Sequence, residues 1–348
     1  MSLMSQASAD LPLPKPHPGR RRSYWFAVVV GAIYGLAARL IFESPLWHRN
    51  ASGYAGGAML VSFLFLMPLV VGAMTVYLRR GAIGVGGAIV APWLPMLIVL
   101  GLSAVFNIEG SICIVLAAPI FLIASSVGGL LMLGVLAMIT PAPKVLSVAL
   151  LVPLLLGYGE RDLTVADSLR QSDESIHIDA PPEAIWRLIN GARAITPAEM
   201  ERGLAWRIGV PYPMEAVTVD TPQGRVRKLR WQRGVHFDEP IVAWDENRFI
   251  QWHYRFAPDS IPAGALDDHV RIGGQYFDLL DTSYRLDPEA GGTRLSIHVT
   301  YRVSTHFNWY AGGLARVLVD DSARTILSFY KRRSERDTTV AGAALASR

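Results

Sequence analysis

Four long apolar stretches in the first half of the chain constrain its fold more than any other feature. They are Tyr24 to Phe42, Ala55 to Leu78, Ala82 to Phe106 and Ser111 to Thr140. Each is close to the ~20 residues that an α-helix needs to cross the ~30 Å hydrocarbon core of a bilayer. A fifth stretch, Val145 to Gly157, is shorter, but its flanking residues could extend it into the interfaces. We therefore expect five membrane-spanning helices, or alternatively four, within residues 23–158.

The loops between these stretches alternate in charge. A basic tail, residues 1–22, precedes the first stretch, Arg79 and Arg80 separate the second from the third, and Lys144 separates the fourth from the fifth. Cytoplasmic loops are enriched in Lys and Arg, which predicts a cytoplasmic N-terminus. Five crossings would place the C-terminal half outside, and four would leave it in the cytoplasm. We expect an integral protein of a plasma membrane or bacterial inner membrane, with the outside placement favoured.

Small residues within the apolar stretches predict close helix packing. Gly31 and Gly35 form a GxxxG pair, and Gly128, Gly129 and Gly134 add further small surfaces. Ordinary packing within the bundle is favoured over a specific dimer interface, and a homo-oligomer formed through these helices is the alternative. Arg39 lies inside the first stretch near its end, where its long side chain could reach the membrane interface. The stretches therefore give little support for a transport pathway.

The second half of the chain has the composition of a globular domain. Residues 163–348 hold 23 Lys and Arg against 24 Asp and Glu, whereas residues 1–162 hold 10 against 5. The charges of the second half are interleaved and balanced, so we expect no nucleic-acid partner. The single cysteine, Cys113, lies in an apolar stretch, which excludes an internal disulfide and a thiolate cluster.

A linker at 159–174 leads into alternating patterns. Ile176 to Ile178 reads as a strand, Pro181 and Pro182 start a helix, and Thr196 to Arg202 predicts a second short helix. Five further segments have the period of two expected of strands: Arg225–Arg233, His236–Trp244, Arg248–Phe256, Gln275–Leu286 and Thr293–Val303. A long helix is expected at Phe307–Arg333, followed by a disordered tail at 338–348. This order predicts an α+β domain.

Three segments of this domain resemble a known superfamily. They are SIHIDAPPEAIWRLI at 175–189, GVHFDEPIVAWDENRFIQWHY at 234–254 and GGTRLSIHVTYRV at 291–303. Together with the closing helix they resemble the SRPBCC superfamily, whose START-like or helix-grip domains include polyketide cyclases and the birch-pollen allergen family. The resemblance covers a domain at about 175–337. It implies an antiparallel, curved sheet around a long C-terminal helix, with a cavity between them for an apolar small molecule.

Strand alternation identifies the residues expected to line such a cavity. Apolar and aromatic side chains share one face of each strand, and aromatic rings with a polar tip suit ligand pockets. A cavity is favoured over a filled core, which would use much the same residues. The expected lining residues are Leu229, Trp231, Phe237, Ile241, Trp252, Tyr254, Tyr276, Tyr284, Ile297, Val299, Tyr301, Leu314 and Val317.

Three carboxylates occupy positions that could face the cavity. Burial would raise the pKa of Glu239, Asp278 and Asp321 and make them candidate acid or base groups, although solvated positions at sheet edges or on a helix flank are favoured. Asp267, Asp268 and His269 stand together in a segment that could bind a cation, but a solvated loop is favoured there too. Histidine spacing indicates no metal site, and no motif indicates a cofactor.

The sequence thus predicts a membrane helical bundle that carries a START-like domain. We expect the domain to bind a hydrophobic small molecule or lipid at the surface of the lipid bilayer, and binding alone is favoured over catalysis. One alternative is a cyclase or hydrolase acting on a hydrophobic substrate. Another is a sensor or assembly module for the membrane bundle.

Overall fold

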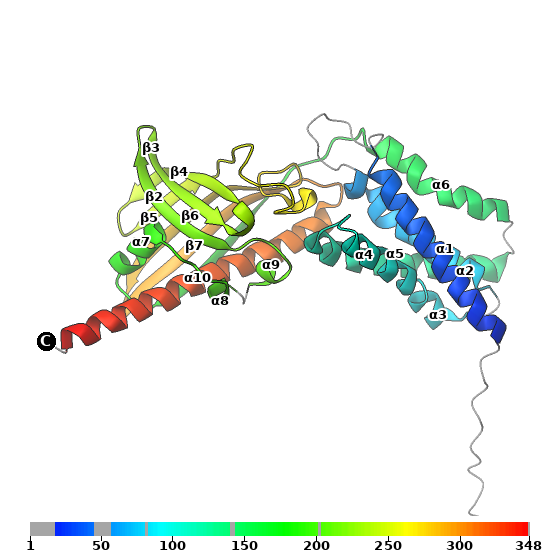
Figure 1. The fold of residues 1–348 in the computed structure, drawn as a ribbon, viewed down its shortest axis with the longest axis horizontal. Helices are drawn as coiled ribbons and strands as arrows, with labels where there is room; N and C mark the ends of the chain where they lie inside the picture. The colour runs from blue at the N-terminus through cyan, green and yellow to red at the C-terminus, as the bar shows by residue number, and fades with distance from the viewer. Residues whose placement is uncertain (1–17, 45–56, 81–82, 140–142, 201–202, 347–348) are drawn as a thin grey trace, which may run out of the picture.

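The fold of the chain is known from a computed structural model. It describes residues 18–44, 57–80, 83–139, 143–200 and 203–346 (Figure 1). Within these residues a helical region comes first, and a sheet with its helices follows along the chain. The beginning of the predicted basic tail, residues 1–17, lies outside the described residues.

The helical region is built from α1 to α6. Their bounds are α1 Pro18–Phe42, α2 Met67–Leu78, α3 Val85–Val90, α4 Trp93–Val105, α5 Ser111–Met138 and α6 Pro143–Glu160. A π-helical turn at Ser62–Leu66 leads into α2, and a break before Trp93 separates α3 from α4. In the described residues three segments are long and apolar enough to cross a membrane: Ser23–Phe42, Val85–Val105 and Ser111–Met138. Ser62–Leu78 and Ser147–Glu160 are shorter apolar helices, so five or four crossings stay a prediction.

Glycines set the closest helix contacts in this region. A Cβ added at Gly72 of α2 would lie 1.8 Å from the Ser125 carbonyl oxygen of α5, and one at Gly128 of α5 would lie 1.9 Å from the Leu69 carbonyl oxygen of α2. Neither backbone could approach so closely with any side chain present. Gly31 and Gly35 of α1 face side chains of α4. A Cβ there would lie 3.1 Å from Pro95 Cβ and 2.7 Å from Val99 Cγ2, respectively. Four of the predicted small residues, Gly31, Gly35, Gly128 and Gly129, thus contact neighbouring helices of the same chain, whereas Gly134 faces open space, and a homo-oligomer stays a prediction.

A seven-stranded antiparallel sheet forms the second part of the structure. Its strands are β1 Ser168–Ile178, β2 Pro213–Thr221, β3 Gly224–Trp231, β4 His236–Asp245, β5 Phe249–His253, β6 Phe277–Glu289 and β7 Gly292–Val303. Their order across the sheet is β1-β7-β6-β5-β4-β3-β2. β1 begins at Ser168, inside the segment predicted as a linker, because residues 168–174 pair with β7. β2 was not predicted.

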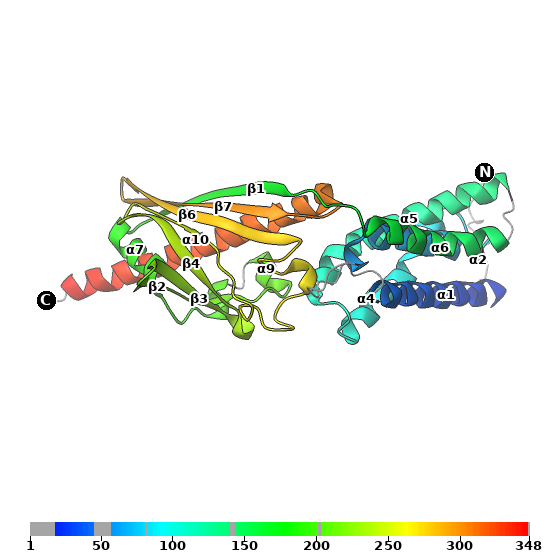
Figure 2. The ribbon, with the colours of Figure 1, turned by 90° about the horizontal axis from the view of Figure 1, so that it is seen from above.

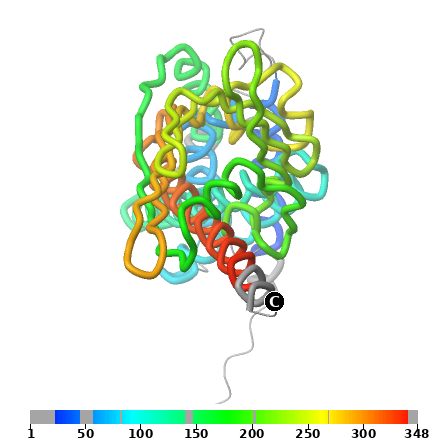
Figure 3. Tube along the Cα trace, turned by 90° about the vertical axis from the view of Figure 1, so that its left-hand side faces the viewer, coloured from blue at the N-terminus to red at the C-terminus, as the bar shows by residue number. Residues whose placement is uncertain are grey.

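The long helix α10, Asn308–Ala346, packs along this sheet. It contacts β1 and β7, and the short helices α7 Pro182–Gly191, α8 Pro197–Met200 and α9 Leu204–Arg207 pack beside it. Figures 2 and 3 show the strands curving around α10. The predicted fold class is confirmed, since a curved antiparallel sheet grips one long C-terminal helix. The tail at 338–348 was predicted to be disordered, but α10 continues through most of it, to Ala346.

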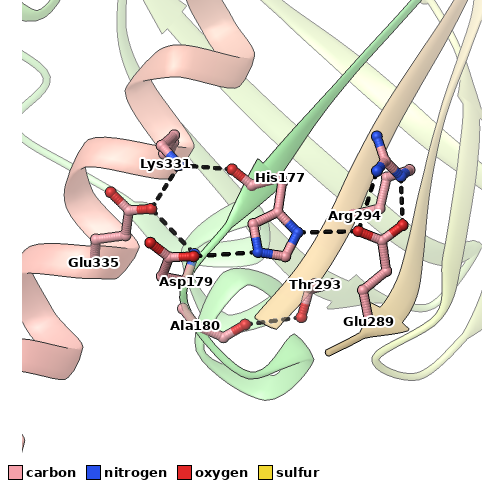
Figure 4. Close-up of polar contacts among 8 residues, drawn as sticks. All are labelled: His177, Asp179, Ala180, Glu289, Thr293, Arg294, Lys331 and Glu335. Carbon is pink, nitrogen blue, oxygen red and sulfur yellow. Dashed lines mark hydrogen bonds and ion pairs between the residues drawn. The ribbon is translucent and has the colours of Figure 1, made fainter. Parts of the chain in front are cut away.

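Polar contacts hold α10 against β1 near the C-terminal end of the helix (Figure 4). Lys331 donates to the carbonyl oxygen of His177 at 2.7 Å, and Glu335 accepts from the backbone N–H of Asp179 at 3.0 Å. The His177 ring contacts Glu289 at the β6–β7 turn, with 2.9 Å between Nδ1 and Oε2. The polar groups in these contacts face away from the interior of the domain. We therefore interpret the cluster as one that holds α10 on the sheet and not as a ligand site.

Candidate functional site

A cavity of about 330 Å³ lies between α10 and the sheet and continues among the helices of the first region. Small-molecule sites in proteins commonly have volumes of roughly 300 to 1,000 Å³. The domain is therefore not solidly packed. The wall is mostly apolar, and residues from both halves of the chain contribute to it.

The helical region supplies one end of this cavity. Phe63, Val99, Leu116, Ile120 and Phe121 belong to the π-helical turn, α4 and α5, and all of them line it. The start of α10 is held at the same end, because Tyr310 donates its hydroxyl to the Leu116 carbonyl oxygen at 2.7 Å. No motif predicted this contribution, since the resemblance to a known superfamily covered the second half of the chain alone.

Most of the predicted lining residues lie on the cavity wall. Nine of the thirteen do so: Leu229, Trp231, Trp252, Tyr254, Tyr276, Tyr284, Ile297, Val299 and Leu314. They come from β3, β5, β6, β7 and α10, together with the segments beside β5 and β6. Strand alternation thus identified the inward face of the sheet. Whether these side chains contact a ligand stays a prediction.

Four predicted lining residues do not lie on the wall. Val317 is 52% exposed, because the inward face of α10 runs through Leu314, Leu318 and Ala315 instead. Tyr301 is fully buried beside Phe277, in the packed part of the core. Two others come from β4. Phe237 is buried against the rings of Trp231, Tyr254 and Phe256, and Ile241 sits where a register shift between β4 and β5 turns the strand.

A buried ion pair lies at the domain end of the cavity. Arg227 of β3 and Glu239 of β4 both line it, and 2.5 Å separates Arg227 Nη1 from Glu239 Oε2. Arg227 also donates to the carbonyl oxygen of Ile189 at 3.1 Å and to the hydroxyl of Tyr330 at 3.1 Å. One arginine thereby joins β3, β4, α7 and α10. It shares the strand parity of Leu229 and Trp231, the signal by which the sequence could have revealed it.

Burial changes the acidity of Glu239. Its side chain is 2% exposed, and loss of hydration raises the pKa of the Glu239 carboxyl to about 7, although the Arg227 guanidinium opposes that shift. The hydroxyl of Tyr254 is hydrogen-bonded to Thr282 at 2.7 Å, and both residues line the same cavity. A carboxyl that titrates near neutral pH in an apolar cavity can donate or accept a proton, or orient a polar group of a guest.

The other two predicted carboxylates do not line the cavity. Asp321 of α10 accepts a hydrogen bond from the backbone N–H of Leu204, the first residue of α9, and so satisfies a free helix-end donor. Asp278 of β6 is half-buried, with no partner for its Oδ1 among the described residues, and burial raises the pKa of its carboxyl. Of the three candidates, only Glu239 is positioned for chemistry on a guest in this cavity.

A second polar cluster lies at the junction between the helical region and the domain. Arg39 is 2% exposed and contacts Glu109, with 2.7 Å from Nε to Oε1, and it also pairs with Glu43. His269 is 7% exposed, with Nδ1 at 3.4 Å from Glu109 Oε2 and 3.6 Å from Cys113 Sγ. Arg39, Glu109, Cys113 and His269 all line the cavity.

This junction cluster corrects two predictions. Arg39 was expected to extend to the membrane interface, but it is buried because Glu109 and Glu43 neutralise it. The segment around His269 was expected to be a solvated loop. His269 is instead buried, and Asp267 accepts from the backbone N–H of Cys113 at 3.1 Å. No local spacing could reveal the cluster, because its members lie far apart in the sequence.

Comparisons with known proteins find similarities in the second half of the chain. Residues 170–335 match the family described as polyketide cyclase/dehydrase and lipid transport, so this segment is a domain of that type. Similar solved structures include the Zhui aromatase/cyclase from Streptomyces sp. R1128, with 13% identity, a TM-score of 0.30 and coverage of 50% of this chain and 99% of that one. The di-domain aromatase/cyclase BexL of the BE-7585A biosynthetic pathway has 16% identity, a TM-score of 0.29 and coverage of 58% and 61%. The comparison with curated proteins finds no match.

Proposed function

We propose that this protein binds a hydrophobic small molecule or lipid in the cavity under α10, at the surface of a membrane in which its helical region is embedded. The cavity is mostly apolar and has a volume in the range of ligand sites. Burial of an apolar guest is favourable by roughly 25 cal/mol per Å² of apolar surface. Two polar groups on the wall, the pair Glu239 with Arg227 and the junction cluster, would fix the guest's orientation.

The observation that carries this proposal is the continuity of the cavity with the helical region. Its wall includes Trp252 and Tyr284 of the sheet together with Ile120 and Phe121 of α5, and it is mostly apolar. A guest with low solubility in water could therefore reach the domain from the bilayer side. The membrane attachment would also present the guest at a high effective concentration.

The outer surface of the helical region supports the membrane assignment. Several large apolar side chains of α1 and α5 are more than half exposed, among them Phe26, Ile33, Ile123 and Met138. Such surface is costly in water but favourable in lipid. The basic residues Arg79 and Arg80 favour a cytoplasmic N-terminus. Five crossings would then put the domain outside, which we favour, and four would leave it in the cytoplasm.

A cavity-filling variant tests the proposal. Ala315 lines the cavity on α10, whereas Val317 lies on the outer face of the same helix. Native mass spectrometry and lipid extraction of the full-length protein should recover about one hydrophobic molecule per wild-type chain. We expect Ala315→Trp to remove most of it and Val317→Trp to retain it, with both variants remaining folded by thermal unfolding. The proposal is contradicted if no hydrophobic molecule is extracted from wild-type protein and the protein takes up none from lipid vesicles.

A second candidate function is an enzyme that acts on the same class of molecule. The observation in its favour is Glu239, which lines the cavity and has a pKa raised to about 7 by burial. Such a group can serve as acid or base in a cyclisation, hydrolysis or isomerisation. Conversion of the extracted molecule by wild-type protein, and its loss in a Glu239→Gln variant that still binds the molecule, would establish this function. Equal turnover in both proteins would exclude Glu239 as the catalytic group.

A further inference from the structure

Three side chains that can bind a metal ion meet at the junction between the helical region and the domain. Glu109 lies in the loop between α4 and α5, Cys113 in the first turn of α5, and His269 in the turn at 268–270 of the domain. Their potential ligand atoms all lie within 4.8 Å of one another. We propose that Glu109, Cys113 and His269 bind a divalent zinc ion that joins the two parts of the protein.

The distances fit one tetrahedral ion. Zinc bonds of about 2.0 Å to oxygen or nitrogen and about 2.3 Å to sulfur place neighbouring ligand atoms roughly 3.3 to 3.6 Å apart. His269 Nδ1 is 3.4 Å from Glu109 Oε2 and 3.6 Å from Cys113 Sγ. The third pair, Glu109 and Cys113, lies within 4.8 Å, which a small side-chain movement could bring into the same range.

Neighbouring groups hold two of the three ligand residues in place. Arg39 donates to Glu109 Oε1 at 2.7 Å, which orients the carboxylate and leaves Oε2 for the ion. Asp267 accepts from the backbone N–H of Cys113 at 3.1 Å and so holds the first turn of α5 against the His269 segment. Gly110 permits this approach, because a Cβ there would lie 1.5 Å from Asp267 Oδ1.

The chemistry of the donors selects the ion. A thiolate with an imidazole and one carboxylate favours zinc over magnesium or calcium, which prefer oxygen ligands. Binding would release the thiol proton of Cys113 to solvent and would leave His269 as a neutral imidazole with its one ring proton on Nε2; an imidazolium at His269 would release its Nδ1 proton to solvent as well. Three carboxylates, Glu109, Glu43 and Asp267, lie here against Arg39 and His269, so the negative charges outnumber the positive ones and favour a cation.

The site would also communicate with the cavity. All three ligand residues line it, so a fourth coordination position is open to a water or to an oxygen atom of the guest. His269 Nε2 is buried without a partner among the described residues, and ligation through Nδ1 would leave a hydrogen-bond donor there. Because two ligands come from the helical region and one from the domain, the ion would fix the junction where the cavity crosses it.

Cobalt titration of the full-length protein tests the site directly. Metal-free protein in detergent should bind one equivalent of Co²⁺ and develop the near-ultraviolet charge-transfer band of a cobalt thiolate. Loss of a ligand in Cys113→Ser or His269→Ala should weaken Co²⁺ binding by at least about 100-fold. Groups that only hydrogen-bond to the ligands of a metal ion already contribute about 10- to 100-fold to its affinity. His253→Ala, which changes an exposed histidine of β5, should bind as wild type does.

A second measurement needs no variant. Cys113 is the only cysteine of the chain, so a maleimide reagent reports on this site alone. One equivalent of Zn²⁺ should slow its labelling at least tenfold, and excess Mg²⁺ should leave the rate unchanged. The proposal is overturned if wild-type protein shows no thiolate band, if the band persists in Cys113→Ser, or if Zn²⁺ leaves the labelling rate unaltered.

Discussion

Replacement of Glu239 by glutamine should stabilise the protein at pH 8 and leave its stability at pH 5 nearly unchanged. Glu239 and Arg227 are both buried, with 2.5 Å between their nearest polar atoms. Burial raises the pKa of the Glu239 carboxyl in the folded protein to about 7, from its ordinary value of 4.5. Glutamine has nearly the same shape and its carbonyl oxygen can still accept from Arg227. The substitution therefore removes the titration while it preserves most of the packing.

The sign follows from the two pKa values. A carboxyl with a raised folded-state pKa contributes stability that is present below about pH 4.5 and is lost as the pH rises through about 7. A shift of this size corresponds to roughly 3 kcal/mol in the free energy of unfolding. Most of that loss, roughly 2 to 3 kcal/mol, falls between pH 5 and pH 8. The Glu239→Gln variant has no such loss.

Thermal unfolding of the full-length protein in detergent, followed by tryptophan fluorescence, measures the difference. For a domain of this size 1 kcal/mol shifts Tm by about 2 to 4 °C, so at pH 8 the variant should melt roughly 6 to 12 °C above wild type. Glu246→Gln, at an exposed turn position, is the matched control and should follow wild type at both pH values. A Glu239→Gln variant that melts well below wild type at pH 8 would refute the reasoning. The ion pair would then stabilise the fold, as expected if its disruption leaves Arg227 buried and unpaired.

Three further predictions concern packing, the predicted carboxylates and membrane topology. Gly128→Ala should lower the stability of the helical region by about 1 to 3 kcal/mol through overpacking, whereas Gly134→Ala, with open space at its Cβ, should not; equal melting temperatures would contradict this. Asp321→Ala should cost about 1 kcal/mol by removing the acceptor for the Leu204 N–H, with no loss of a bound guest; loss of the guest would instead place Asp321 in the site. Protease added to intact cells should cleave residues 163–348 if the helices cross the membrane five times, and cleavage only in inverted vesicles would establish the four-crossing topology.

The sequence predicted those elements whose residues repeat with a clear period. The strand face of Leu295, Ile297 and Val299 alternates strictly, and the structure buries that face in the interior of the domain. β2, with the sequence PMEAVTVDT, was missed because apolar residues fall on both of its faces and prolines precede it. On α10 the face predicted to line the cavity included one position that the structure exposes. Val317 is exposed there, while Ala315, which is too small to signal a core position, lines the cavity.

The junction could not be predicted because it consists of contacts between distant segments. Glu109 and His269 are separated by the whole of α5, α6 and most of the sheet, and each looks unremarkable in its own segment. Their proximity depends on how the domain docks on the helical region, which no local periodicity encodes. The same holds for Arg227, whose role requires Ile189, Glu239 and Tyr330 to meet around it.

The attachment of α10 at its first turns has a mechanical consequence. Phe307 is buried among residues of the helical region, and Tyr310 is hydrogen-bonded to α5. The first turns of α10 are therefore fixed to the helical region. If the helix moved away from the sheet, its far end would move most and its first turns least. A guest larger than the cavity would push α10 away from the sheet, and the contact of Tyr310 would transmit that force to α5. Under the proposed function, occupancy of the cavity and the packing of α5 would in this way be mechanically coupled.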